Sequence, residues 1–369
     1  MASGNIYSVK EIDKKWNRQM LQILKQSPVE TPLLKIVFDR EPDIFTIPEK
    51  KSAKLKCTGL FIRNRLAGFA MMLYREVLVK GQKQMVLYFG DMVVHPFARG
   101  KGFLYRVSDA FLKGVTDKMM GYAVIMQGNR AAKRMLNRFH PRYPNMPYSK
   151  MIGEWHAINI LLTFSISRKT DVSVRHARMK DADSIVRLLA NEYSARLFSP
   201  AVTNKSFIND IKTGIRKISD YYVAELSDEI VGVCCAVDLT PFKQNRILQY
   251  RRQFKWVRLI YQFFALIFHF PEWPPEGQPL RDITVTDYAV KNRNPDILRS
   301  ILIKIYNEFR QKSYHLLIFG CGAEDPLIEA ARGFVSQSVV SDIIIFSKSK
   351  KVIDQWHDTS CPFIDMELL

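Results

Sequence analysis

A short glycine-containing loop carries the residues best suited to chemistry. Residues 93–102 read Val-Val-His-Pro-Phe-Ala-Arg-Gly-Lys-Gly and separate a strand-like apolar run from a helix-like one. Gly100 and Gly102 allow the backbone to approach an anion closely, and the free N–H groups at a helix start point toward it. Arg99 and Lys101 add two cations beside these donors. The loop predicts a seat for a phosphate or pyrophosphate, although a Gly-x-Gly turn before a helix also occurs without a ligand.

The elements predicted around this loop are three strands before it and a helix after it. Apolar side chains at helical spacing over residues 8–27 predict a further helix upstream. Downstream, a short apolar strand, a helix and a closing strand are expected. In chain order the runs are Cys57–Ile62, Ala67–Val79, Met85–Val94, Gly102–Met119 (helix), Ala123–Met126, Asn129–Phe139 (helix) and Trp155–Ser165.

The same order of elements begins again after a polar linker at Ser167–Thr170, so we predict two domains, residues 1–166 and 171–369. The second set opens with a strand and a helix, continues with a hairpin, and later alternates strands and helices. Its runs are Val172–Arg178, a helix through Leu189 and Tyr193, Tyr221–Leu226, Ile230–Val237, Ile283–Val290, Ile297–Phe309 (helix), Leu316–Phe319, Pro326–Ala331 (helix) and Ile343–Phe346.

The loop resembles the phosphate-binding motif of the GNAT superfamily of acyl-CoA N-acyltransferases, in which Val-x-Pro-x-x-Arg-Gly-x-Gly follows a strand. Val94, Pro96, Arg99, Gly100 and Gly102 fall in register with it. The resemblance implies an α+β fold, layered α/β/α, with two tandem GNAT-like domains. Each domain would hold a mixed, mostly antiparallel sheet flanked by helices.

Asn129, Ala132 and Phe139 also resemble the family's second helix motif, in which Asn-x-x-Ala precedes an aromatic residue. The resemblance implies that main-chain amides of the loop hold the CoA pyrophosphate, that two valines at a splayed strand edge pair with the pantetheine, and that an asparagine contacts the cofactor or holds the second helix. The implied CoA-binding residues are Val93, Val94, Arg99, Gly100, Lys101, Gly102, Phe103 and Asn129.

Acyl transfer to an amine also requires a base and an acid, because the amine loses a proton and the leaving thiolate gains one. Asp91, two residues before Val93, is the best-placed carboxylate, and a structural role in a bulge is an equal alternative. The family often uses a Tyr as the acid. Leu136 occupies that position here, so Tyr143 or Tyr148 would have to substitute.

The second half keeps the pattern of a GNAT domain but lacks its loop. Lys291–Asp296 follows the strand that corresponds to Met85–Val94 and contains no glycine. We therefore predict a degenerate domain that does not bind CoA. It also carries an insert over residues 243–275, basic at first and then apolar, which either packs on the protein or lies on an anionic membrane surface.

The net charge and the cysteine content restrict the class of binding partner but do not identify a single partner. The net charge of +19 favours anionic partners such as CoA, nucleic acid or an acidic membrane. The five cysteines lack metal-ligand spacing, so we expect no metal and reduced thiols in a cytoplasmic protein. No secretory signal is recognisable from Met1 onward.

Three functions stay open on these grounds. The first is an enzyme that transfers an acyl group, most simply from acetyl-CoA, to an unidentified amine acceptor. The second is an aminoacyl-tRNA-dependent transferase, which the positive charge would suit. The third is a non-catalytic GNAT-like module that binds a partner or a membrane; Leu104, where the family has a small residue, keeps it open.

Overall fold

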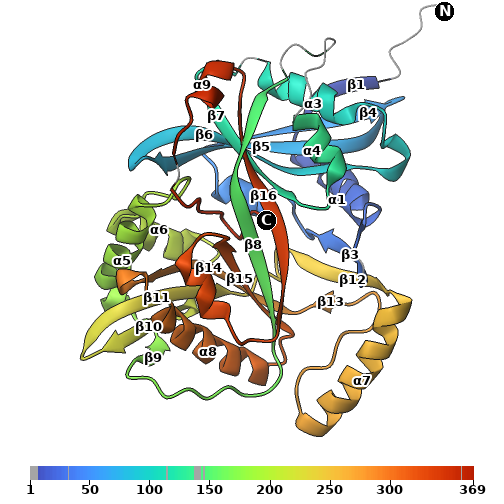
Figure 1. Ribbon diagram of the computed structural model, residues 1–369. Coiled ribbons are helices and arrows are strands. Elements are labelled where there is room, and N and C mark those ends of the chain that lie inside the picture. The colour runs from blue at the N-terminus through green and yellow to red at the C-terminus, as the bar shows by residue number, and fades with distance from the viewer. Residues whose placement is uncertain (1–6, 32, 114, 137–142, 144–145, 359) are drawn as a thin grey trace, which may run out of the picture.

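The computed structural model describes residues 7–31, 33–113, 115–136, 143, 146–358 and 360–369. Within them one large twisted sheet runs through both halves of the chain, and a small second sheet lies beside it (Figure 1). In spatial order the large sheet contains β1 (Tyr7–Ile12), β4 (Lys54–Ile62), β5 (Arg65–Val79), β6 (Gln82–Val94), β7 (Met120–Met126), β16 (Ser336–Ser347), β8 (Tyr148–Leu161), β15 (Leu316–Gly322), β14 (Asp282–Val290), β11 (Glu229–Val237), β10 (Tyr221–Leu226) and β9 (Ser173–His176). The small sheet contains β13 (Pro279–Leu280), β12 (Gln244–Tyr250), β3 (Leu34–Asp39) and β2 (Val29–Glu30).

Helices cover both faces of the large sheet, which confirms the predicted layered α+β fold. In the first half α3 (Phe103–Leu112) packs on one face, while α1 (Asn17–Lys25) and α2 (Thr46–Lys50) lie against the other. In the second half α8 (Pro295–Gln311) covers one face, and α5 (Ala182–Ser194) with α6 (Asn204–Thr213) covers the opposite one. The other α-helices are α4 (Arg130–Leu136), α7 (Arg252–Phe268) and α9 (Lys350–Asp354).

The two halves repeat one strand pattern, as the sequence indicates. Each half has one parallel pair, β6 with β7 and β14 with β15, and the other neighbours in the large sheet are antiparallel. The three strands predicted before the loop are β4, β5 and β6. Arg63 and Asn64 take positive φ between β4 and β5, the conformation that a tight hairpin turn requires.

The helix predicted over residues 8–27 is wrong in its first part. Tyr7–Ile12 forms β1, which pairs antiparallel with β4, and the helix begins only at Asn17. The side chain of Asp13 accepts a hydrogen bond from the Lys15 amide and caps the intervening turn. The open edge of β4 offers backbone hydrogen bonds to this segment, and helical spacing alone cannot reveal that partner.

The last long strand of the second half lies inside the sheet of the first half. β16 pairs with β7 from Ser341↔Met126 to Ser347↔Met120 and, on its other side, with β8. β8 in turn pairs with β15. The two halves thus exchange strands, and no edge separates them. The domain boundary that we expect at residues 167–170 stays a prediction from the sequence.

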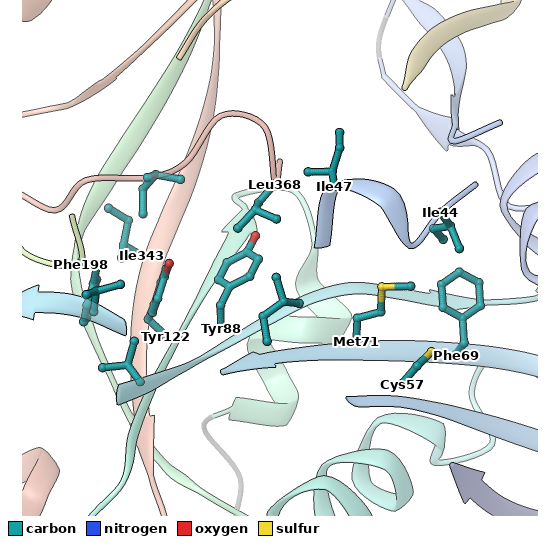
Figure 2. Packing of buried hydrophobic residues seen from close by; sticks show 14 of the residues in the cluster. Ile44, Ile47, Cys57, Phe69, Met71, Tyr88, Tyr122, Phe198, Ile343 and Leu368 are labelled. Carbon is teal, nitrogen blue, oxygen red and sulfur yellow. The ribbon is translucent and has the colours of Figure 1, made fainter. Parts of the chain in front are cut away.

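Residues 361–369, called the 361–369 segment below, form a buried strap between the halves. Phe363, Ile364, Met366 and Leu368 are all at most 7% exposed. Phe363 packs on Tyr193 in the second half, with ring centroids 4.8 Å apart. Ile364, Met366 and Leu368 join the core of the first half, where Figure 2 shows Leu368 above the ring of Tyr88.

Candidate active site

The predicted anion loop lies between β6 and α3, with Gly100 exposed and Gly102 half-buried. Gly100 and Gly102 have φ of 76° and 71°, a conformation that favours glycine. A side chain added at either position would meet no atom within 4 Å. Among the described residues no side chain caps the first turn of α3, so its amides are available to an anion.

A buried aromatic ring fixes the start of α3 against the sheet. Phe103, the first residue of the helix, is 3% exposed. Its ring lies where a side chain on Gly68 of β5 would be, 3.1 Å from the ideal Cβ position. Gly68 therefore permits the close packing that places the loop at the end of β6.

Two cations flank the loop on its outer side. Arg99 and Lys101 are both exposed. The Arg99 Nε donates to the Val94 carbonyl oxygen over 3.3 Å, and the Lys101 Nζ lies 5.9 Å from the centre of the Phe97 ring. The arrangement places positive charge beside the free amides of α3, as a diphosphate requires.

His95 begins the turn that leads into the loop. One ring nitrogen lies 2.7 Å from the Gln26 Oε1 atom, and the ring packs against Phe97. Partial burial and the nearby charges of Arg65 and Arg99 hold the pKa of His95 below its usual value. The imidazole therefore favours its neutral form at neutral pH.

β6 separates from β7 before it reaches the loop. The two strands pair only at Leu87↔Gly121 and Tyr88↔Tyr122. Val93 and Val94 still pair with β5 on their other side. The stretch Phe89–Val94 thus has no strand partner toward β7, and this is the splayed edge at which the sequence predicts pantetheine binding. The Val94 carbonyl already accepts from the Ser27 hydroxyl at 3.3 Å.

Asp91 lies in a bulge of β6. The register with β5 shifts between Phe69↔Val93 and Met71↔Gly90, and Asp91 takes a φ of 44°. A bulge redirects a side chain out of the strand's alternation. The Asp91 carboxylate lies 3.5 Å from the Arg40 Nη2 atom, and its side chain is 22% exposed.

A small, shallow pocket, open at its mouth, adjoins this bulge. Its walls come from the chain around α2, from the bulge, from the connection after β11 and from the 361–369 segment. The lining residues are Arg40, Asp43, Ile44, Ile47, Pro48, Asp91, Phe242, Glu367 and Leu368. Both halves of the chain therefore build the pocket, with three carboxylates and one guanidinium at its wall.

Comparison with solved structures identifies the architecture. No protein-family profile and no curated protein matches the sequence. The fold of Saccharomyces cerevisiae N-myristoyltransferase with bound myristoyl-CoA matches with a TM-score of 0.61 at 12% identity, over 94% of this chain and 80% of that one. A GCN5-related N-acetyltransferase from Sphaerobacter thermophilus matches with a TM-score of 0.57 at 10% identity, over 99% of both chains. One from Anabaena variabilis matches with a TM-score of 0.51 at 10% identity, over 93% and 73%.

The chain has the GNAT fold. The matches extend over nearly the whole chain and so include both halves, in agreement with the tandem arrangement that the sequence predicts. At 10–12% identity they concern the fold alone.

The two tyrosines predicted as acids are not among the residues that line the pocket beside Asp91. Tyr143 stacks on Tyr105 of α3, with ring centroids 5.8 Å apart, and joins the core on the α3 face of the GNAT sheet. The pocket beside Asp91 adjoins the core on the opposite face, through Ile44 and Leu368. Tyr148 is exposed at the start of β8.

The asparagine predicted to contact CoA or hold the second helix begins α4. The Asn129 Oδ1 accepts a hydrogen bond from the Ala132 amide at 3.2 Å, which caps the first turn of the helix. Phe139, the aromatic residue of the same motif, lies outside the described residues.

In the second half, the position that corresponds to the anion loop is occupied by the protein's own side chains. The corresponding helix, α8, is capped by the Asn294 side chain, which accepts from the Asp296 amide at 2.9 Å. Arg293 points back into the protein and forms ion pairs with Glu192 at 3.0 Å and Asp325 at 2.7 Å. An anion at this helix start would compete with groups that the fold already supplies.

The gap between β14 and β15 is also filled. The two strands pair only from Asp282↔Leu316 to Thr284↔Ile318. Beyond that point the Tyr288 hydroxyl donates to the Gly320 carbonyl at 3.0 Å, and the buried Arg196 guanidinium lies over the Tyr288 ring. Tyr288 and Arg196 thus lie beside the unpaired part of β14, and the absence of CoA binding by this half stays a prediction.

Sequence reasoning missed the residues that surround Asp91. Arg40, Phe242 and Leu368 come from three distant parts of the chain, and no local motif marks them.

Proposed function

We propose that this protein is an N-acyltransferase that moves an acyl group from a CoA thioester to an amine. The observation that carries the proposal is the uncapped start of α3, with two open glycines and two cations, at the point where β6 leaves β7. Main-chain donors and cations in this arrangement suit a pyrophosphate. The unpaired edge at Val93 suits the amide groups of a pantetheine arm.

In the proposed reaction the amine nitrogen attacks the thioester carbonyl carbon. The new C–N bond forms as the C–S bond breaks, the amine loses a proton, and the CoA sulfur leaves as a thiolate that takes up a proton. We assign Asp91 as the group that accepts the amine proton, because it lies in the pocket at the bulge of β6. Tyr143 and Tyr148 stay candidates for the proton donor.

The acidic wall of the pocket supports a basic acceptor. Asp43 and Asp91 line it with a single guanidinium, that of Arg40, while Glu367 is neutralised by Lys51 and Arg216. On a chain of net charge +19 this local negative wall attracts a protonated amine and disfavours an anionic acceptor. The second half contributes Phe242 and thereby helps to shape this site.

The donor is proposed to be acetyl-CoA in the simplest case, and a longer acyl chain is the alternative. The yeast N-myristoyltransferase that shares the fold was solved with myristoyl-CoA bound. All five cysteines are free, as expected in a reducing compartment, and the cytoplasm is the proposed location.

Calorimetric titration with CoA tests the proposal. Arg99→Glu should abolish measurable binding, because it replaces a cation beside the diphosphate with an anion. Lys205→Glu, an exposed position on α6, makes the same charge change and should bind as the unaltered protein does. Absence of CoA binding by the unaltered protein would refute the proposal. Radiolabelled acetyl-CoA and myristoyl-CoA, each with a panel of amines, then identify donor and acceptor.

A further inference from the structure

Helix α7 presents an unusual amount of apolar surface. Of the 19 large apolar side chains exposed in the described part of the chain, nine lie on this one helix. Leu266 is 71% exposed, Trp256 69% and Phe263 62%. Figure 1 shows α7 projecting away from both sheets. Exposed apolar patches of this kind mark contact sites on folded proteins.

The helix is held firmly on its inner side. The return segment after it, residues 270–275, covers one face through Tyr261, whose hydroxyl donates to the Pro271 carbonyl at 2.9 Å and whose ring packs on Phe270. At the base Phe254 packs between Tyr250 and Trp273. These contacts fix the position of α7, so its outward apolar face stays exposed to solvent.

The charged residues of α7 lie at its N-terminal end, and the rest of the helix is uncharged. Arg252, Lys255 and Arg258 lie in its first two turns, and the residues from Leu259 to Phe268 carry no charge. No acidic residue occurs between Asp238 and Glu272. Arg258 is held over the Tyr250 ring, whereas Arg252 and Lys255 are exposed at the rim of the apolar surface.

We propose that α7 is a docking arm for the surface of a bilayer that contains anionic lipids. The apolar side chains of the outward face enter the boundary between headgroups and acyl chains, and the rim cations contact lipid phosphates. Trp256 lies between the two zones, where membrane-bound proteins concentrate tryptophan.

Charge complementarity selects this occupant over a second copy of the chain. Two α7 arms packed in parallel would bring like cations together, and two packed antiparallel would set the cations of one arm against the uncharged half of the other. In either case residues 239–271 supply no acid to pair with the cations of the second copy. Lipid phosphates supply the missing negative charge. Consecutive exposed residues such as Trp256 and Val257, or Leu259 and Ile260, also present a broad face, wider than the stripe that a helix-binding groove covers.

The arm is suited to lie on a bilayer. Its 17 residues extend about 25 Å, less than the hydrocarbon core of about 30 Å. None of the helices that the structure describes combines the length and the hydropathy of a membrane span.

Vesicle sedimentation with the full chain tests the proposal. The unaltered protein should sediment with phosphatidylcholine vesicles that contain 30% phosphatidylglycerol and should lose most of this binding on pure phosphatidylcholine. Leu266→Glu should abolish binding. Met179→Glu, at an exposed apolar residue far along the chain, is the matched control and should bind normally. Arg252→Gln with Lys255→Gln should weaken binding roughly 30-fold, at about 1 kcal/mol for each cation.

A fluorescence readout separates docking from aggregation. Emission of Trp256 should shift to the blue on anionic vesicles, and the shift should vanish in Trp256→Phe, which keeps the other four tryptophans. Equal sedimentation of Leu266→Glu and the unaltered protein would overturn the proposal. So would a dimer, seen without vesicles, that Leu266→Glu dissociates, because α7 would then be occupied by a second copy.

Discussion

The Arg75 Nη2 atom lies 3.1 Å from the Asp365 Oδ2 atom, joining β5 to the 361–369 segment across 290 positions of sequence. Both side chains are 5% exposed. Lys51 approaches the same carboxylate at 3.4 Å, and Arg75 also donates to the Tyr122 hydroxyl. A buried charge with several partners is costly to leave alone, so this contact holds the segment in one position.

Asp365→Asn should destabilise the protein by about 3–5 kcal/mol at neutral pH, because it leaves buried cations without their partner. Burial opposes ionisation of Asp365, but the charges of Lys51 and Arg75 outweigh it and hold its pKa below the usual range. The ionised form therefore stabilises the fold above the unfolded pKa of about 3.9, and this contribution is lost as pH falls toward the lower, folded pKa.

Thermal unfolding between pH 7 and pH 2 measures this effect. The difference between the unaltered protein and Asp365→Asn should shrink steadily below about pH 4. Asp171→Asn, at an exposed carboxylate, should change stability by less than about 0.5 kcal/mol throughout. A difference that is constant with pH would contradict the assigned role of the charge.

Gly121→Ala should destabilise the protein by about 1–3 kcal/mol through overpacking. Gly121 of β7 pairs directly with Phe346 of β16, whose ring atoms lie 2.3–2.9 Å from where a Cβ would be. Phe346→Leu in the same chain should recover part of the loss, with a coupling of about 0.5–3 kcal/mol in urea unfolding. Gly153→Ala, where a Cβ meets nothing within 4 Å, is the control and should be close to neutral. Strictly additive effects would argue against direct packing of β16 on β7.

Asp91→Asn should lower kcat by about 10²–10⁴-fold while leaving the affinity for CoA unchanged, if the residue accepts the amine proton. Glu76→Gln, an exposed carboxylate on β5, should leave both constants unaltered. Steady-state kinetics with calorimetry on the same samples separate the two effects. Full activity of Asp91→Asn would show that Asp91 has a structural role in the bulge and does not accept the amine proton.

Fragments 1–168 and 169–369 should not fold separately but should associate when expressed together. The first fragment lacks β16, which separates β7 from β8, and the second lacks β8, which separates β16 from β15. Amide NMR spectra of each fragment and of the mixture measure this directly. A well-dispersed spectrum of fragment 1–168 alone would show that it can close its own sheet.

Local signals in the sequence were sufficient for the loop and for most strands. Gly100, Gly102 and the following helix are neighbours in the chain, so their spacing predicts their geometry. The hairpin at Arg63–Asn64 was recognisable for the same reason. These features depend on contacts of short sequence separation.

Features that depend on distant contacts were not recognisable. β1 exists because β4 offers it an edge, and β16 lies beside β7 because the halves exchange strands. The pocket likewise combines Arg40, Phe242 and Leu368, whose proximity follows from tertiary packing. Periodicity describes which face of an element is apolar, and it carries no information on which element covers that face.

The position of β16 has a consequence for biosynthesis. β7 ends at Met126, but the strand that covers its edge is not complete until Ser347 has left the ribosome. At about 5–20 residues per second, roughly 10–40 s pass in between. Throughout that interval the nascent chain exposes an unpaired strand edge of the kind that promotes aggregation. Chaperones that shelter such edges should therefore raise the yield of this protein in cells.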